Sequence, residues 1–284
     1  MQFAVNDTIY WYDVKGKGVP IVLLHGFTGS NGTWESFKAT YAAQYMVITI
    51  DLPGHGKTIS NTPKTMEACC HDLNELFCHL KLSKIHLVGY SMGGRAALSF
   101  AMLYSEMIQT LTLESASPGL HTEEERSKRK AHDDHLAARI LEEGLEKFLR
   151  YWEQIPLFHS QRRLPEPIQE KLHQERFAQE ERGLANSLRF MGTGCQPSWW
   201  EELKGFTNDV LLLVGELDEK FIGINQEMHK LFPNSKLTIV PDAGHAIHLE
   251  QPDIFGKLVT DFILKSTLHR NNEEENDDCT MGES

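Results

Sequence analysis

The sequence predicts an α/β fold in which a mostly parallel sheet is covered by helices on both faces. Short runs of apolar and β-branched residues recur along the 284-residue chain, as in buried parallel strands. Segments of helical periodicity lie between several of these runs, and strands that alternate with helices favour parallel pairing. The expected strands are 21–24, 46–50, 85–88, 111–113, 210–214 and 237–240, and the expected helices are 65–80, 92–104, 220–232 and 250–265. Residues 3–14 are expected to form an antiparallel hairpin that leads into the sheet.

One long segment interrupts this alternation. Between about residues 118 and 206 there is no strand pattern, and charged amphipathic helices are expected instead. Thr122 and Glu125 have the spacing of a capping box, so one helix is expected to begin there and to end near Gly144. Helical insertions over a sheet edge often serve as lids. We therefore expect a core (1–117 and 207–267), a helical lid (118–206) with further helices at 145–154 and 166–179, and an acidic disordered tail (268–284).

Composition and charge exclude several classes of protein. The net charge is −12, and residues 271–284 hold six acidic residues and no basic one. A nucleic-acid-binding surface would need a basic surplus, so no nucleic-acid partner is expected. The start of the chain lacks a signal-peptide pattern, and the apolar runs are too short for membrane insertion. The five cysteines form no CxxC pair, which favours free thiols in a reducing compartment. We expect a cytoplasmic protein, monomeric or weakly homo-oligomeric, without a metal or another cofactor.

The run GYSMG at residues 89–93 matches the motif G-x-S-x-G. It lies between an expected strand and an expected helix, which is the context of the nucleophile elbow in the α/β-hydrolase fold. Its glycines allow a sharp turn that raises the serine hydroxyl above the sheet edge. The sequence therefore predicts an α/β-hydrolase fold with Ser91 as its reactive residue.

A serine hydroxyl reacts only with help from a base, so a histidine and a carboxylate are expected further along the chain. In this fold the acid precedes the histidine. Of the acids after the fifth expected strand we choose Asp218, and we expect Glu216 and Glu219 to be solvated. After the last expected strand we choose His245, because Ala-Gly before it and a helix after it place it on a loop at the sheet edge. His248 falls at the start of that helix and is expected to pack or to cap it.

Two glycine-containing runs have different interpretations. HGFTG at residues 25–29 directly follows the first expected strand, and we expect the backbone N–H groups of Phe27 and Met92 to form an oxyanion hole. DLPGHGKT at residues 51–58 ends like a P-loop, but Asp51 stands where that motif needs glycine. We interpret the second run as the turn after a strand rather than as a nucleotide site.

Five runs in this order resemble one enzyme family: LHGFTGS, DLPGHG, GYSMGGRAA, ESASPGLHTEEER and GELDEKF. Over about residues 1–265 the chain is similar to the 2-succinyl-6-hydroxy-2,4-cyclohexadiene-1-carboxylate synthases of menaquinone (vitamin K2) biosynthesis. The resemblance implies a cofactor-independent lyase that removes a ring proton and expels pyruvate, without attack by water. It also implies a substrate with three carboxylates, on the ring, on the succinyl arm and on the enolpyruvyl ether.

Arg95 gains a role from this resemblance. It lies four residues after Ser91, one helical turn from it and near the start of the expected helix. In a plain esterase a cation at this place would lack a partner. Next to the polyanionic substrate that the resemblance implies, Arg95 is expected to bind a carboxylate.

Four further residues are candidates for substrate binding. Arg129 shares a helical stripe with apolar residues seven and eleven positions further on, so it would extend an apolar face toward the cleft. Trp152 ends another apolar face and would meet the substrate ring or pack in the core. Tyr90, beside the serine, would face the cleft or fill the core. Arg176 corresponds by motif position to a third arginine of the family's lid, as the resemblance implies.

Together these features predict a lyase in which Ser91, activated by His245 and Asp218, takes a ring proton from a small polyanionic substrate. One alternative is a serine esterase or C–C bond hydrolase that uses Ser91 as a nucleophile. A second is a catalytically silent ligand receptor on the same fold. The intact serine, acid and histidine argue against silence, and the arginine after the serine argues against an apolar ester.

Overall fold

A computed structural model describes the backbone of residues 1–281 and the side chains up to Leu268. Its sheet has the strand order β1-β2-β4-β3-β6-β7-β8-β9, with β5 paired to β2. β1 (Gln2–Val5) and β2 (Thr8–Lys15) form the expected antiparallel hairpin, and β2 pairs antiparallel with β4. All further pairs along the sheet from β4 to β9 are parallel. The predicted α/β fold with a mostly parallel sheet is confirmed.

The six predicted strands all occur, and most are longer than expected. They are β3 (Pro20–Leu24), β4 (Met46–Ile50), β6 (Ile85–Tyr90), β7 (Ile108–Glu114), β8 (Asp209–Gly215) and β9 (Ser235–Val240), while β5 (Ile59–Ser60) is a short addition. The extra residues include polar ones such as Glu114 and Asp209, which pair in the sheet although they do not continue the apolar run. Because β6, β8 and β9 run parallel, the segments that follow them begin at one edge of the sheet.

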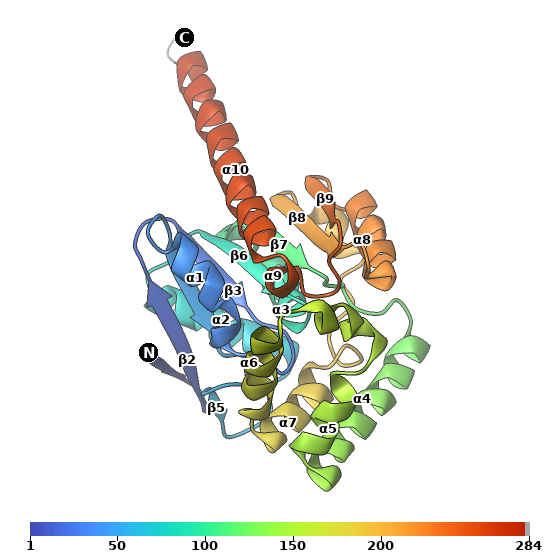
Figure 1. Ribbon diagram of the computed structural model, residues 1–284. Helices are drawn as coiled ribbons and strands as arrows, with labels where there is room; N and C mark the ends of the chain where they lie inside the picture. Colours follow the sequence, from blue (N-terminus) through green and yellow to red (C-terminus); the bar gives the residue numbers. More distant parts are fainter. Residues whose placement is uncertain (282–284) are drawn as a thin grey trace.

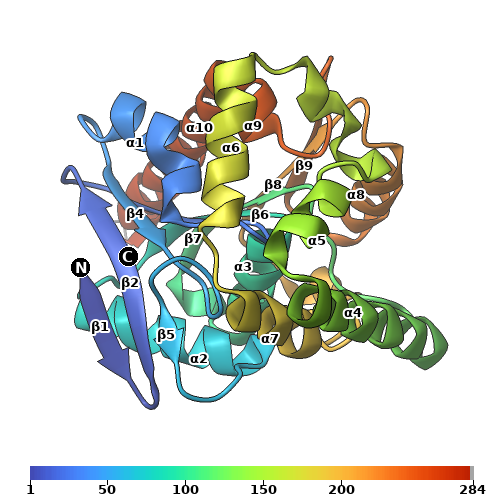
Figure 2. The ribbon, with the colours of Figure 1, turned by 60° about the horizontal axis from the view of Figure 1, so that its bottom comes forward.

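Helices cover both faces of the sheet (Figure 1, Figure 2). One core lies under α2 (Met66–His79), α3 (Met92–Leu103) and α8 (Glu219–Leu231). A second core lies under α1 (Glu35–Tyr41), α9 (Ile247–Glu250) and the first turns of α10 (Pro252–Met281). This arrangement leaves the carboxyl edge of the strands for the elbow at Ser91 and for the loops after β8 and β9.

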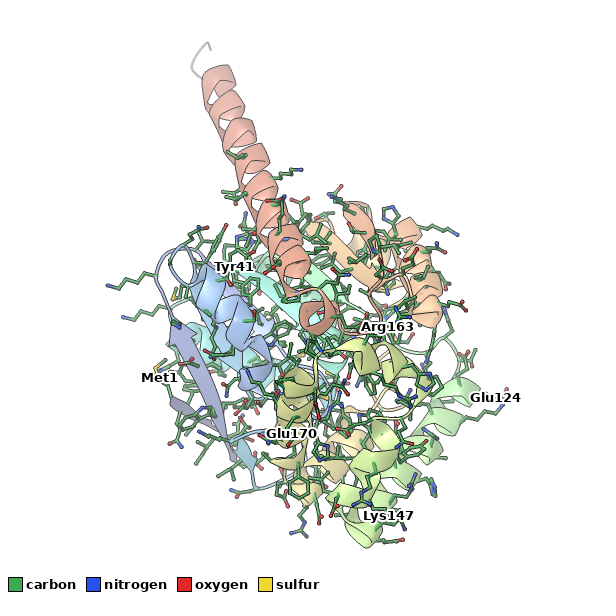
Figure 3. All side chains as sticks on the ribbon, in the orientation of Figure 1. Met1, Tyr41, Glu124, Lys147, Arg163 and Glu170 are labelled. Atoms are coloured by element: carbon green, nitrogen blue, oxygen red, sulfur yellow. The ribbon has the colours of Figure 1, made fainter. Side chains whose placement is uncertain are left out.

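Residues 118–206 form a helical block on the side away from the free end of α10 (Figure 1). Its elements are α4 (Glu123–Glu143), α5 (Leu145–Trp152), η3 (Pro156–Arg163), α6 (Glu166–Phe177), α7 (Glu181–Met191) and η4 (Glu202–Gly205). Thr122 and Glu125 make the predicted capping box, and α4 ends at Gly144. The block has a small core of its own, formed by α4, α5 and α7. Charged side chains such as Glu124 and Lys147 point away from the body of the protein (Figure 3).

Polar side chains of η3 and α6 attach the helical block to loops of the core. Ser160 donates a hydrogen bond to Glu250 Oε1 at 3.0 Å. Glu175 Oε1 accepts from Ser30 Oγ at 2.7 Å and from Thr33 Oγ1 at 2.9 Å. Just after the end of α6, Gln179 Oε1 accepts from the backbone N–H of Gly56 at 2.8 Å. The block therefore contacts both the loop after β3 and the loop after β9.

Several short elements of this fold were not predicted, and α1, η3 and α7 are the longest of them. Each is short, and α7 carries Gly183 in its first turn, which lowers intrinsic helix propensity. Packing supplies what propensity does not, because Leu184, Ala185 and Leu188 of α7 are buried against α4 and α5. The expected helix 250–265 is divided, since α9 ends at Glu250 and Pro252 begins α10.

Residues 268–284 were expected to form an acidic disordered tail, whereas the structure places most of them in α10. The backbone of α10 continues to Met281 and extends away from the body (Figure 1), while residues 282–284 lie outside the described part of the chain. Between Gly256 and Met281 the sequence holds neither proline nor glycine, so no residue there interrupts the helix. Among the helices that the structure describes, none combines the length and the apolar character needed to cross a membrane.

Deleting residues 271–284 is expected to leave turnover and Tm nearly unchanged. The segment is rich in acidic residues and poor in apolar ones, so it offers little surface to pack against the core. Thermal unfolding and steady-state rates of the truncated chain check this. A clear loss of activity would mean that the tail docks on the folded protein.

Gly93→Ala is expected to lower the free energy of unfolding by about 1–3 kcal/mol, the usual range for overpacking. A Cβ at this position would lie 2.2 Å from the carbonyl oxygen of Leu24 and 2.4 Å from that of His25, and neither backbone group can move freely. Gly223→Ala is the matched control, because no heavy atom lies within 4 Å of its added Cβ. In the middle of α8 that substitution should stabilise by about 0.5–1 kcal/mol. Chemical denaturation of both variants measures the difference, and equal midpoints would contradict it.

Candidate active site

Ser91 stands at a sharp turn between β6 and α3. Its backbone has φ 50° and ψ −109°, a left-handed conformation that a residue with a side chain rarely adopts. The turn is fixed from one side by a hydrogen bond from the Ser91 N–H to the carbonyl oxygen of Glu114, at 2.9 Å. The hydroxyl faces a pocket at the carboxyl edge of the sheet, as the nucleophile-elbow motif predicts.

The structure brings Ser91, His245 and Asp218 into one chain of hydrogen bonds. His245 Nε2 lies 3.0 Å from Ser91 Oγ, and His245 Nδ1 lies 2.7 Å from Asp218 Oδ2. Asp218 follows β8 and His245 follows β9, so three separate strand ends supply the three side chains. A carboxylate acceptor at Nδ1 holds the proton there and leaves Nε2 free to accept the serine proton. The histidine and the aspartate are both buried.

His25 orients the peptide group that contains the Phe27 N–H. Leu52 N–H donates to His25 Nε2 at 3.0 Å, so the neutral ring carries its proton on Nδ1 and donates to Gly26 O at 2.8 Å. Because a trans peptide holds C=O and N–H on opposite sides, this bond also fixes the direction of the Phe27 N–H. Burial lowers the pKa of His25, which keeps the ring neutral. Phe27 and Met92 both line the pocket beside Ser91.

The pocket has a volume of about 350 Å³. It is lined by eight of the ten residues chosen from the sequence: Phe27, Tyr90, Ser91, Met92, Arg95, Arg129, Trp152 and His245. Asp218 lies behind His245, and Arg176 lies outside the lining. A pocket of this size suits a small substrate.

Arg95 points from α3 toward the helical block. Its Nη1 donates to the carbonyl oxygen of Met191 at 2.8 Å and to Gln196 Oε1 at 2.6 Å. No carboxylate in the described part of the chain forms an ion pair with it, although Asp133 stabilises its charge at longer range. Burial, and secondly the charge of Arg129, lower the pKa of Arg95 to about 10. The guanidinium therefore remains charged at neutral pH while lacking a direct counter-ion.

Arg129 forms an ion pair within its own helix, α4. Its Nε lies 2.8 Å from Asp133 Oδ1, one helical turn further along α4. Asp133 is buried, and among the described residues its second oxygen, Oδ2, has no hydrogen-bond partner. The pocket lining also holds Glu125, which accepts from the Thr122 N–H, and Glu227, which lies 3.5 Å from His121 Nε2. Among the described residues, neither carboxylate forms an ion pair with Arg95 or Arg129.

Tyr90 and Trp152 form aromatic walls of the pocket. The Tyr90 ring lies 5.4 Å from the His245 ring, and burial raises the pKa of the Tyr90 phenol well above its usual value. Trp152 stacks on Phe148 at 5.6 Å and meets the edge of Phe27 at 5.4 Å. The indole N–H of Trp152 is buried, and no partner for it occurs in the described structure.

Arg176 has partners within the helical block. Its Nη1 lies 3.2 Å from Glu153 Oε1, and its Nη2 donates to Gln161 Oε1 at 2.9 Å. The guanidinium also lies over the Phe158 ring, 5.2 Å from its centroid. Phe158 in turn lines the pocket, so Arg176 supports the pocket wall from behind in this conformation.

The amides of the turn that resembles a P-loop are occupied within the protein. Gly56 N–H donates to Gln179 Oε1, and Lys57 N–H donates to Asp51 Oδ2, both at 2.8 Å. They are therefore not free to cradle a phosphate. Within the described residues, no group of three or more His, Cys, Asp or Glu side chains is placed to hold a metal ion.

Known proteins share both the fold and the order of these residues. A family model described as alpha/beta hydrolase fold matches residues 19–252. A Bacillus subtilis (strain 168) protein, provisionally named 2-succinyl-6-hydroxy-2,4-cyclohexadiene-1-carboxylate synthase, is 49% identical over 246 residues, which cover 86% of this chain and 89% of that protein. The chain belongs to the 2-succinyl-6-hydroxy-2,4-cyclohexadiene-1-carboxylate synthase family.

Two further comparisons agree. A synthase of that name from Photorhabdus laumondii is 31% identical over 245 residues, covering 86% of this chain and 84% of its own. Among solved structures, MenH from S. aureus has a TM-score of 0.87 and 37% identity, and the match covers 91% of this chain and 98% of that one. The resemblance inferred from the five sequence runs is confirmed.

Two pocket residues close to Asp218, Lys220 and Phe221, were not chosen from the sequence. Lys220 lines the pocket two residues after Asp218, in the first turn of α8. Burial lowers the pKa of Lys220, and the charge of Arg129 lowers it further. The feature of the sequence that could have indicated Lys220 is its position two residues after Asp218, in the helix that begins at the same edge of the sheet. The neighbouring Phe221 was also missed, and its ring lies 4.7 Å from that of His245.

Proposed function

We propose that the protein eliminates pyruvate from 5-enolpyruvoyl-6-hydroxy-2-succinyl-cyclohex-3-ene-1-carboxylate to give 2-succinyl-6-hydroxy-2,4-cyclohexadiene-1-carboxylate, a lyase reaction of menaquinone biosynthesis. The observation that carries this proposal is the composition of the pocket. The serine–histidine–aspartate chain opens onto a pocket where Arg95 forms no ion pair among the described residues and Arg129 pairs with the buried Asp133. Family membership supplies the reaction, and a guanidinium without an ion pair at this place fits a carboxylate of its polyanionic substrate.

In this proposal Ser91 is the base for the ring proton. His245 Nε2 accepts the hydroxyl proton as Ser91 Oγ takes the proton from the ring carbon, and Asp218 stabilises the charged imidazole. The electrons of the broken C–H bond form the 2,3 double bond of the product, the 3,4 double bond of the substrate moves to the 4,5 position, and the C–O bond to the enolpyruvyl group breaks. The departing enolate takes a proton back from His245 through Ser91 and becomes pyruvate. No water is consumed.

The two oxyanion donors act on the succinyl arm. Proton removal places negative charge on the succinyl carbonyl oxygen, and the N–H groups of Phe27 and Met92 are proposed to stabilise it. Fixed backbone donors cost no reorganisation in the transition state, which makes such sites effective. The helical block, residues 118–206, is proposed as a lid that closes this site against water.

The rival function is serine hydrolysis, with Ser91 as a nucleophile. The distance of 3.0 Å between Ser91 Oγ and His245 Nε2 favours it as well, since nucleophilic catalysis uses the same pair. Arg95 distinguishes the two, because it forms no ion pair among the described residues and a neutral ester would give its guanidinium no counter-charge. The receptor interpretation has no such support, since all three residues of the hydrogen-bonded chain are in place.

One assay separates these functions. The purified protein is given the enolpyruvyl substrate in one arm and a series of p-nitrophenyl esters in the other, and the release of pyruvate or nitrophenol is followed. Efficient pyruvate release with slow ester hydrolysis is expected. Fast ester turnover without pyruvate release would assign the protein to the serine hydrolases, and the absence of both activities would favour a binding protein.

A further inference from the structure

Glu114 connects two segments that carry the proposed catalytic side chains. It is the last residue of β7 and is fully buried. Its carbonyl oxygen accepts the hydrogen bond from Ser91 N–H at 2.9 Å, and its partner across the sheet is Tyr90. The main chain of Glu114 therefore fixes the turn that presents the serine.

The carboxylate of Glu114 binds the segment that carries His245. Its Oε1 accepts from the backbone N–H of His248 at 3.0 Å, and its Oε2 lies 2.9 Å from His248 Nδ1. His248 is three residues after His245, at the start of α9. One residue thus binds the serine turn through its main chain and the histidine loop through its side chain.

Among the described residues, the side-chain hydrogen bonds of the Glu114 carboxylate are those with His248. It does not line the pocket, and its side chain lies against His248 and near the Tyr90 ring, whose centroid is 4.5 Å from that of His248. A buried carboxylate costs free energy, and well-packed apolar side chains fill such a place at least as favourably. A residue of this type is useful when its two oxygens must fix two donors of a separate segment in direction as well as in distance.

We propose that Glu114 is a positioning residue that sets the distance between Ser91 Oγ and His245 Nε2. The geometry of proton transfer is sensitive to this distance, since a misplacement of about 1 Å can cost on the order of 100-fold in rate. The carboxylate fixes the start of α9, and α9 fixes the loop on which His245 lies. The proposal rests on the proposed use of Ser91 and His245, but not on the identity of the substrate.

Glu114→Gln tests the proposal with little change in shape. The amide keeps one acceptor and replaces the other with an N–H₂ donor, so it can bind both groups of His248 only when the imidazole proton moves from Nδ1 to Nε2. We expect kcat for pyruvate release to fall about 10- to 100-fold with little change in KM, because the substrate does not touch this residue. The control is Asp72→Asn, which alters another buried carboxylate, bound to Asn6 and Lys64 away from the pocket. It should reduce stability without reducing kcat.

A second measurement does not need the substrate. A fluorophosphonate labels a serine only when its histidine is aligned, so the labelling rate of Ser91 reports the same geometry directly. If the wild-type protein labels rapidly but releases no pyruvate, the proposed function fails while the inference about Glu114 is still tested. Slower labelling in Glu114→Gln, but not in Asp72→Asn, supports the inference.

The opposite outcomes are equally clear. Wild-type labelling and kcat in Glu114→Gln would make the Glu114–His248 pair an ordinary core contact and overturn the proposal. If Glu114→Gln does not fold, His248→Gln answers the question, because it keeps the backbone N–H and one side-chain donor but moves the donor away from the ring position. A reduced labelling rate in that variant supports the proposal, and an unchanged rate overturns it.

Discussion

Ser91→Ala and His245→Ala are each expected to reduce kcat for pyruvate release by about 10²–10⁴-fold, the usual contribution of a positioned base. The distance of 3.0 Å between Ser91 Oγ and His245 Nε2 makes the two groups one path for the proton, so loss of either interrupts it. The serine hydroxyl faces the pocket rather than a packed core, so its removal should leave Tm nearly unchanged. Single-turnover measurement of pyruvate release, together with thermal unfolding, checks both statements.

His229→Ala is the control for histidine truncation. His229 is exposed on α8, and its ring binds Ser235 at 2.8 Å, away from the pocket. It should retain wild-type kcat. A near-normal elimination rate in Ser91→Ala would remove the serine from the mechanism and leave His245 or another group as the base.

Arg95→Ala is expected to lower kcat/KM by about 10- to 150-fold. A charge-assisted hydrogen bond contributes about 1.5–3 kcal/mol, and each 1.4 kcal/mol corresponds to about tenfold. The guanidinium is charged and part-buried, and it forms no ion pair among the described residues. A substrate carboxylate would therefore be its direct counter-ion. Steady-state kinetics with the enolpyruvyl substrate measure the loss.

Two further variants separate substrate binding from support of the fold. Arg95→Lys should recover only part of the loss, because a point charge does not reproduce the planar fork of donors. Arg139→Ala removes an arginine of α4 that pairs with Glu143 and does not line the pocket, and it should leave kcat/KM unchanged. The hydrogen bonds from Arg95 to Met191 and Gln196 support the alternative, in which Arg95 stabilises the fold instead of binding substrate. A large drop in the Tm of Arg95→Ala with intact kcat/KM would make this arginine a structural link between α3 and the helical block.

The core of the fold was predictable because its signals are local. Apolar runs mark the buried strands, and a strand followed by a sharp glycine-containing turn placed Ser91 at the sheet edge. The acid and the histidine could be chosen because each follows a strand that ends at the same edge as β6. Strand order and direction select the segments that carry Asp218 and His245, but they do not separate Asp218 from Glu216 and Glu219, which follow the same strand.

The partners of the chosen arginines could not be predicted in the same way. Arg176 binds Glu153 and Gln161 on other elements of the helical block, and Arg95 binds groups about a hundred residues further along the chain. Such pairs depend on how the helices pack, which no spacing in the sequence records. Lys220 was not predicted to line the pocket for a related reason, since the direction of its side chain depends on where α8 begins.

The hydrogen bonds from η3 and α6 to the core also determine how the pocket can open. Ser160, Glu175 and Gln179 join η3, α6 and the segment just after α6 to α9 and to the loops after β3 and β4. In contrast, α4 and α5 pack mainly within the helical block. Moving α6 away from the core would break several hydrogen bonds at once, at about 0.5–1.5 kcal/mol each. The block therefore resembles a flap that is fastened along one side. If the block is the proposed lid, substrate entry would follow a movement of α4 and α5 while η3 and α6 remain hydrogen-bonded to the core.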